Sequence, residues 1–356
     1  MRDRLSVQRF VLILTVLTVI GCGAHAARGV ESDVPSLSLG EFRAGSFACT
    51  SFAVYADETL YGMNFDYPDV ELRFTVRPSG DRKVFQMEFA QGNDFSMTVG
   101  MNSAGLFSSC QMLFPEAPAT TSTGPNDLYP WQVYEEALLN MESVSEVTEY
   151  ISDKRVVHWS VTLHDLFADA YGDAMVVEAG SAENAITRIE DDFLVMTNFP
   201  NGDFAGQSYT EVEGVGADRY KIAYENISDN LDRFDVDLGL ETLEKAALEG
   251  EFSTQASMVF DPEKGQVYIA LRRDFSRIWK VSIADGTIET FSGFGRSRTM
   301  PLDASGVLAS ELESSGSSRN VLMVVYLIGL VVVVTIAGVG AGVLVLRRRS
   351  QGASDE

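Results

Sequence analysis

The chain reads Cys49-Thr50-Ser51-Phe52 and, after a short interval, Tyr61-Gly62-Met63-Asn64-Phe65-Asp66-Tyr67. Both stretches are rich in β-branched and aromatic residues, and Asp57-Glu58 between them favours a turn, so together they predict an antiparallel hairpin. A hairpin of this length returns Asp66 to the beginning of the first strand. There the Asp66 carboxylate is placed to hold the main-chain nitrogen of Cys49, as a free amine, by a charge-assisted hydrogen bond.

Cys49 would carry both a nucleophile and a base if it were the first residue of the mature chain. Its thiol attacks, and its α-amine, with a pKa of about 8, takes the thiol proton. This arrangement requires the Ala48–Cys49 bond to break, most economically by attack of the Cys49 thiol on the preceding carbonyl. We therefore expect residues 27–48, which are polar and without sustained periodicity, to be a propeptide or leader.

The first 26 residues have the anatomy of a secretory signal. Three arginines precede an apolar run over residues 10–20, and Ala24-His25-Ala26 provides a small-residue cleavage site. We expect cleavage after Ala26, with residues 1–26 removed. An alternative is a lipoprotein signal that ends at Cys22, because residues 19–22 roughly fit a lipid-attachment box.

The other end of the chain predicts a membrane anchor. Residues 321–346 carry no charge and exceed the roughly 20 residues that cross a bilayer as a helix. Three arginines follow, which places the tail, 347–356, in the cytoplasm and the body outside the cell membrane. Gly338 and Gly342 are spaced like a helix contact and favour a homo-oligomer. Residues 304–320, rich in Ser, Gly and Glu, are expected to form a flexible stalk.

Composition limits the partners and the chemistry. The chain has 356 residues and a formal net charge of −24, which argues against nucleic acid as a partner. Residues 49–303 are enough for one domain with a sizeable core. The signal removed, only Cys49 and Cys110 are left, too few for a disulfide framework, although a bond between them would disable Cys49. No Cys and His residues have zinc spacing, so no metal or other cofactor is expected.

Hydrophobic patterns predict alternating blocks of strands and helices. Val-, Phe-, Tyr- and Thr-rich segments predict strands over 50–55, 60–65, 72–76, 84–89, 96–101, 106–112, 174–178, 185–189, 193–197, 257–260, 266–271, 279–283 and 288–291. Three- and four-residue apolar spacing predicts helices over 131–141, 144–151, 217–227 and 240–248, and residues 163–168 are interpreted as a helical or mixed segment. Two strand blocks separated and followed by helices indicate an α+β fold.

Six ordered motifs resemble one family, the N-terminal-nucleophile hydrolases of linear amides, which comprise choloylglycine hydrolase, penicillin V acylase, isopenicillin N acyltransferase-like proteins and acid ceramidase. The family pattern of Cys-Thr followed by Gly-Arg-Asn-x-Asp is matched at Cys49, Gly62, Asn64 and Asp66. The other five matches are residues 99–106, 163–178, 195–200, 218–220 and 257–265. The resemblance implies an αββα sandwich of two stacked antiparallel sheets flanked by helices.

The resemblance also implies a reaction, the hydrolysis of a non-peptide C–N amide bond through a thioester at Cys49. In it Cys49 is the nucleophile, Asp66 orients its amine, Asn198 donates to the oxyanion and Arg219 organises charge around the site. The expected partner is a small-molecule N-acyl amide.

Two positions depart from the family pattern. Met63 stands where the family has an arginine, so the site lacks the cation that would lower the thiol pKa and position a substrate carbonyl. The second oxyanion contributor falls near Gln111 or Met112. We therefore expect Met63, Gln111 and Met112 to face the substrate.

Two other functions fit parts of the sequence. A papain-like thiol protease would use Cys49, His158 or His164 as the base, and Asn198, which occur in the right order. That fold places its cysteine at the start of a helix, whereas residues 50–55 are strand-like. A membrane-tethered binding protein that kept the hydrolase scaffold and lost turnover would explain Met63.

Overall fold

The computed structural model describes residues 48–116, 120, 123–158, 161–180 and 183–316. Two large antiparallel sheets form its centre, and each has eight strands. The first sheet runs in the order β12 (Phe193–Met196), β1 (Thr50–Tyr55), β2 (Thr59–Asp66), β13 (Thr254–Asp261), β14 (Gln266–Leu271), β15 (Ile278–Ser282), β16 (Thr287–Ser292) and β17 (Thr299–Pro301). The expected hairpin of β1 and β2 is confirmed, with Thr50 opposite Asn64.

The second sheet carries the chain between the two halves of the first. Its order is β11 (Ala185–Arg188), β10 (Ala174–Glu178), β9 (Leu163–Ala168), β6 (Phe107–Met112), β5 (Asp94–Asn102), β4 (Arg82–Gln91), β3 (Leu72–Ser79) and β18 (Val307–Leu308). A separate parallel pair is formed by β7 (Asp127–Leu128) and β8 (Arg155–Val156). Short 3-10 turns lie at Asn201–Phe204, Tyr209–Glu211 and Leu231–Arg233.

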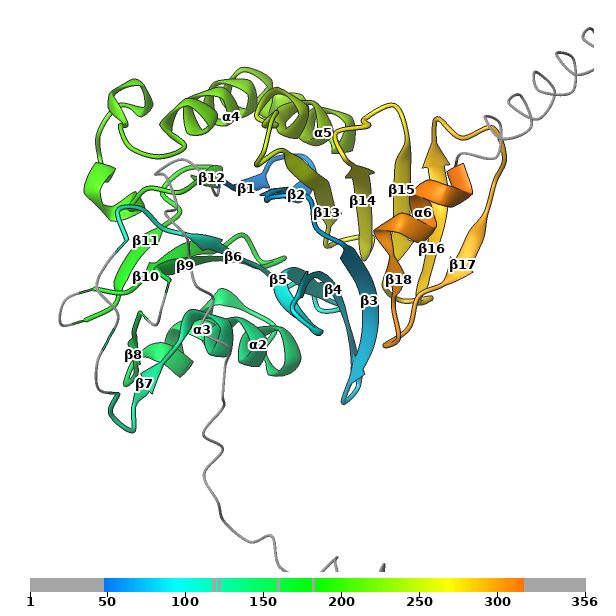
Figure 1. Ribbon diagram of the computed structural model, residues 1–356. Coiled ribbons are helices and arrows are strands. Elements are labelled where there is room, and N and C mark those ends of the chain that lie inside the picture. Colours follow the sequence, from blue (N-terminus) through cyan, green and yellow to red (C-terminus); the bar gives the residue numbers. More distant parts are fainter. Residues whose placement is uncertain (1–47, 117–119, 121–122, 159–160, 181–182, 317–356) are drawn as a thin grey trace, which may run out of the picture. The chain divides into compact units, whose positions relative to one another are not determined.

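Helices cover the outer face of each sheet (Figure 1). The first sheet is covered by α4 (Ala217–Asn230) and α5 (Val236–Lys245), and the second by α2 (Pro130–Asn140) and α3 (Val144–Ile151). Ser143 caps α3 and Asp235 caps α5 by accepting hydrogen bonds from main-chain N–H groups of the first turn. The layers are therefore helix, sheet, sheet, helix, which confirms the expected αββα sandwich.

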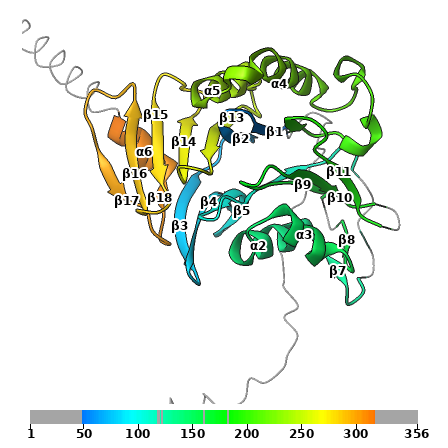
Figure 2. The same ribbon diagram turned by 180° about the vertical axis from the view of Figure 1, so that it is seen from behind.

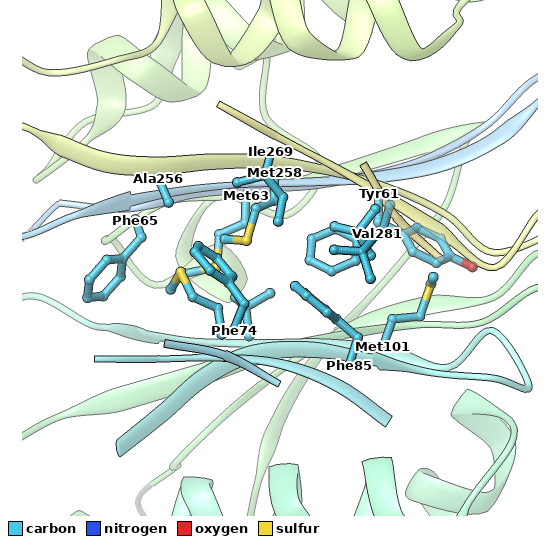
Figure 3. Packing of buried hydrophobic residues seen from close by; sticks show 14 of the residues in the cluster. Tyr61, Met63, Phe65, Phe74, Phe85, Met101, Ala256, Met258, Ile269 and Val281 are labelled. Carbon is cyan, nitrogen blue, oxygen red and sulfur yellow. The ribbon is translucent and has the colours of Figure 1, made fainter. Parts of the chain in front are cut away.

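The largest hydrophobic core lies between the two sheets. Figure 3 shows Tyr61, Met63 and Met258 of the first sheet pointing toward Phe74 and Phe85 of the second. Side chains alternate along each strand, so the neighbouring positions face the helices. Phe52 of β1 accordingly packs in a second cluster with Ile227 of α4 and Leu243 of α5.

Residues 163–168 and 307–316 differ from the sequence-based expectation. Residues 163–168 form strand β9 and not a helical segment. The hydrophobic pattern was misleading because β9 is buried on both faces and therefore lacks a clear period of two. Residues 307–316, expected to be part of a stalk, form β18 and the helix α6 (Ala309–Gly316) beside β3 (Figure 2). Val307 and Leu312 are buried in the core between the sheets.

The expected signal, propeptide and membrane helix, and Cys22, lie outside the described residues. Of the expected propeptide, only Ala48 lies within the described residues. Within the described ranges, no helix has both the length and the apolar character needed to span a bilayer.

Candidate active site

The topology of the first sheet brings Cys49, Asp66 and Asn198 together. Cys49 immediately precedes β1, which lies between β12 and β2. Both neighbours are antiparallel to β1, so they end where β1 begins. Asp66 is the last residue of β2, and Asn198 follows β12. Arg219 enters from the first turn of α4, in the helix layer above the same sheet.

Arg219 and Asn198 bind the main chain of Cys49. The Cys49 N–H donates to Asn198 Oδ1 at 2.8 Å. Arg219 Nη2 donates to the same oxygen at 2.8 Å, and its Nη1 donates to the Cys49 carbonyl and, at 2.9 Å, to Thr50 Oγ1. The planar guanidinium thus joins three groups in one fixed geometry.

Glycine is required where α4 begins. Gly216, the N-cap residue, has a φ of 84°, a conformation that favours glycine. A Cβ atom there would lie 2.5 Å from Arg219 Nη2. The bare backbone at Gly216 therefore makes room for the Arg219 side chain.

The Asp66 carboxyl is buried and half satisfied. Its side chain accepts a hydrogen bond from Thr254 Oγ1 through Oδ1 at 2.5 Å, while Oδ2 lies 3.7 Å from Arg219 Nη1. Oδ2 has no hydrogen-bond partner among the described residues. Burial raises the pKa of Asp66 to about 7, against the opposing effects of Arg219 and Thr254. Asp66 therefore has an oxygen available to accept a proton or an amine hydrogen.

The Cys49 side chain is buried and belongs to the same apolar cluster as Met63. Burial, and secondarily the charge of Asp66, raise the pKa of Cys49 to about 12, although the Asp66 N–H and Arg219 act in the opposite direction. Cys49 is 7% exposed, and its thiol is protonated at neutral pH while the bond to Ala48 is intact. Attack by this sulfur thus requires a base.

Asn198 has one amide hydrogen to spare. Its Nδ2 donates to the Met112 carbonyl at 2.7 Å. Since an amide nitrogen carries two hydrogens, the second can be directed at an oxygen that gains charge near Cys49.

The three expected substrate-facing residues have different surroundings. Met63 is fully buried in the core between the sheets (Figure 3). Gln111 Nε2 donates to Ser51 Oγ, which also accepts from Ser109 Oγ at 2.9 Å. Met112 contributes its carbonyl to Asn198. Thus Gln111 and Met112 contact the residues that flank or bind Cys49, whereas Met63 is part of the hydrophobic core.

The papain-like arrangement with His164 as the base does not fit this geometry. Cys49 precedes a strand, and both ring nitrogens of the fully buried His164 are occupied, Nδ1 by Glu178 Oε1 at 3.1 Å and Nε2 by the Thr197 carbonyl at 2.8 Å. His164 therefore cannot also take a proton from Cys49. Cys49 and Cys110 are both free thiols, so the disulfide alternative is not observed.

Sequence comparisons and structure comparisons give different results. No protein-family model matches the chain, and no curated protein matches it. Among solved structures, an arginine-to-leucine variant of conjugated bile acid hydrolase from Clostridium perfringens matches with a TM-score of 0.52 and 16% identity, over 72% of this chain and 97% of that one. Penicillin V acylase from Agrobacterium tumefaciens matches with a TM-score of 0.55 and 17% identity, over 68% and 91%.

The chain has the N-terminal-nucleophile hydrolase fold. A cysteine-to-alanine mutant of the same bile acid hydrolase matches similarly, with a TM-score of 0.53 and 17% identity over 72% of this chain and 97% of that one. The matching part of this chain therefore superposes on almost the full length of each bile acid hydrolase chain.

Within this fold, several site residues were not anticipated from the sequence. Thr254 orients Asp66 from 188 positions away, and Gly216 admits Arg219. Their proximity follows from the pairing of β2 with β13 and from the start of α4, and neither carries a local sequence signal. Ser109, which contacts Ser51, was also missed.

Two hollows on the described surface lie elsewhere. One of about 440 Å³ is lined by residues such as Tyr55, Asp57 and Asp232, and a smaller one of about 70 Å³ by residues such as Trp279 and Leu312. Neither is lined by Cys49, Asp66, Asn198 or Arg219.

Proposed function

We propose that this protein is a membrane-anchored, extracytoplasmic hydrolase of linear amides in which Cys49 becomes the N-terminal nucleophile. The observation that carries the proposal is the buried polar cluster at Cys49, in which Asn198 and Arg219 bind its main-chain atoms and Arg219 Nη1 lies 3.7 Å from Asp66 Oδ2. One acceptor satisfies the peptide nitrogen of an ordinary strand cysteine, which does not need further buried polar groups such as a guanidinium and a carboxyl, because these are costly to bury. A cysteine whose nitrogen becomes a catalytic amine does need them.

Activation breaks one bond and uses one water molecule. The Cys49 sulfur attacks the carbonyl carbon of Ala48, its proton passes to Asp66, and the C–N bond breaks as the nitrogen takes up a proton. The result is a thioester between Ala48 and Cys49, which water hydrolyses to release the leader. Asp66 suits this role because its pKa of about 7 allows it both to accept and to return a proton.

Catalysis repeats the same chemistry on a bound amide. The free Cys49 amine takes the thiol proton, the thiolate attacks the substrate carbonyl, and Asn198 Nδ2 donates to the developing oxyanion. One such donor contributes on the order of 3 kcal/mol to transition-state stabilisation. The amine then protonates the departing nitrogen, and water cleaves the thioester.

The test combines the mature terminus with activity. Intact mass and N-terminal sequencing of the exported protein are expected to find a chain that begins at Cys49. A panel of N-acyl amides should be hydrolysed by the wild type and by Cys110→Ala, a matched control that removes the other thiol. Cys49→Ala should abolish both processing and hydrolysis. An active protein that starts at residue 27, or activity that survives Cys49→Ala, would overturn the proposal.

A binding protein on the same scaffold is the second candidate, and the burial of the uncharged Met63 in the same cluster as Cys49 favours it. Alkylation kinetics in a Cys110→Ala background separate the two functions. A hydrolase is expected to show rapid modification of a terminal Cys49, whereas a binding protein should show the slow reaction of a buried thiol with a raised pKa.

A further inference from the structure

A buried pair of polar side chains, His164 and Glu178, contacts the main chain on either side of Asn198. His164 on β9 and Glu178 at the end of β10 belong to the second sheet, whereas residues 197–202 follow β12 of the first. His164 Nε2 donates to the Thr197 carbonyl at 2.8 Å. Glu178 Oε1 contacts His164 Nδ1 at 3.1 Å and also accepts from the Asn201 N–H at 2.9 Å. The pair therefore holds the chain on both sides of Asn198.

The protons of this pair are constrained by its neighbours. Because the Thr197 carbonyl can only accept, Nε2 must carry a hydrogen. A neutral imidazole would then present an unprotonated Nδ1 to the Glu178 oxygen, so one further proton must lie between these two atoms. The His164–Glu178 pair is thus hydrogen-bonded to the Thr197 carbonyl at one end and to the Asn201 N–H at the other, and both side chains are almost completely buried. Buried and satisfied polar pairs of this kind hold a backbone in one arrangement.

We propose that His164 and Glu178 are positioning residues for Asn198. They act through the Thr197 carbonyl and the Asn201 amide and have no contact with the reacting atoms. The inference rests on the proposed function, in which Asn198 donates to the oxyanion. A small displacement of such a donor lowers the rate of the chemical step and leaves substrate binding nearly unchanged.

A double-mutant cycle tests the coupling. His164→Leu and Glu178→Leu are each expected to lower kcat about 100-fold with little change in KM. In an Asn198→Ala background the same substitutions should have almost no further effect. Glu178→Gln should recover only part of the activity, because Oε1 makes both contacts of Glu178, and a glutamine atom at that place either accepts from the Asn201 N–H or donates to an unprotonated Nδ1.

Tyr55→Phe is the matched control. The Tyr55 hydroxyl donates to the Asp173 carbonyl at 2.6 Å, which also joins the two sheets but does not involve residues 197–202. Its removal is expected to leave kcat unchanged. Losses of kcat that add in the cycle, or an equal loss in Tyr55→Phe, would overturn the positioning role.

Hydrogen exchange decides the point even if the leucine variants do not fold or if no amide is hydrolysed. In the wild type, the Asn201 amide should exchange at least about 100-fold more slowly than an unprotected amide. Exchange at the unprotected rate would contradict the inference. If Asn201 is protected but the protein has no hydrolase activity, the proposed reaction is wrong, whereas the contacts of His164 and Glu178 with residues 197–201 are retained.

Discussion

Asp66 shows how a single side chain serves two stages of the proposed reaction. Its Oδ1 is fixed by Thr254, whereas Oδ2 is left without a hydrogen-bond partner among the described residues, close to Arg219. While the leader is attached, Oδ2 can receive the thiol proton. Once the leader has gone, the same oxygen can orient the new amine. The burial that raises the pKa of Asp66 thus serves a proton acceptor first and an amine ligand later.

The raised pKa of Asp66 predicts a pH-dependent stability. The pKa of the Asp66 carboxyl is near 4 in the unfolded protein and about 7 in the folded protein. The free energy of unfolding therefore decreases as the pH rises from 4 to 7. The favourable contribution of Asp66 is complete below pH 4 and is lost as the pH rises through 7. The uncleaved Cys49→Ala protein should therefore lose roughly 2 kcal/mol more stability between pH 5 and pH 8 than Cys49→Ala/Asp66→Asn.

Denaturant unfolding at the two pH values measures this difference. All other titrating groups are common to both proteins and cancel in the comparison. Parallel stability curves would show that the folded Asp66 ionises like an ordinary carboxyl.

Strands β1 and β2 show why Gly62 stands between two larger residues of the motif. A Cβ atom at Gly62 would lie 2.2 Å from the ring of Phe52, the residue directly opposite in the hairpin. The ring therefore lies over the glycine and packs with Ile227 and Leu243 of the covering helices. This contact fixes the helix layer above the strands that carry Cys49 and Asp66.

Substitution of Gly62 tests the contact. Gly62→Ala should destabilise the protein by about 1–3 kcal/mol, because the Phe52 ring must leave its rotamer or the strands must separate. Gly295→Ala is the control, since nothing lies within 4 Å of a Cβ atom there. Thermal unfolding of both variants measures the difference. Equal melting temperatures would mean that the ring moves without cost.

Much of the element order could be predicted from the sequence, because most strands carry β-branched and aromatic runs with turn residues between them. The failures have physical reasons. Strand β9 is buried on both faces, so its pattern resembles that of a helix, and α6 buries little beyond Leu312 among serines and glutamates. Asn198 and Arg219 were identified only from the order of several motifs. Thr254 and the His164–Glu178 pair depend on contacts between distant strands, for which the local sequence has no signal.

The whole molecule joins one fold to two predicted targeting segments. The solved structures are covered over 91–97% of their length, but they match only 68–72% of this chain. The difference leaves room for a signal peptide and a C-terminal anchor, which we propose from residues 1–26 and 321–346. The last described helix, α6, ends at Gly316, shortly before the proposed anchor.

Fractionation of cells tests the anchor. The full chain is expected in the membrane fraction, resistant to high salt, because about 20 apolar residues hold a protein in a bilayer irreversibly. A chain that ends at Gly316 keeps the buried Leu312 and should be released as a soluble, folded protein. A full chain that salt removes from membranes would argue against a spanning helix.

The hydrogen bond between the Cys49 nitrogen and Asn198 joins residues 149 positions apart. It can form only after β12 has paired with β1, so under the proposed mechanism a chain that has not made this long-range pairing would be unable to remove its own leader. Self-cleavage would then act as a test of folding. Misfolded molecules would keep the leader and have no free amine at Cys49, and only correctly folded molecules would become active.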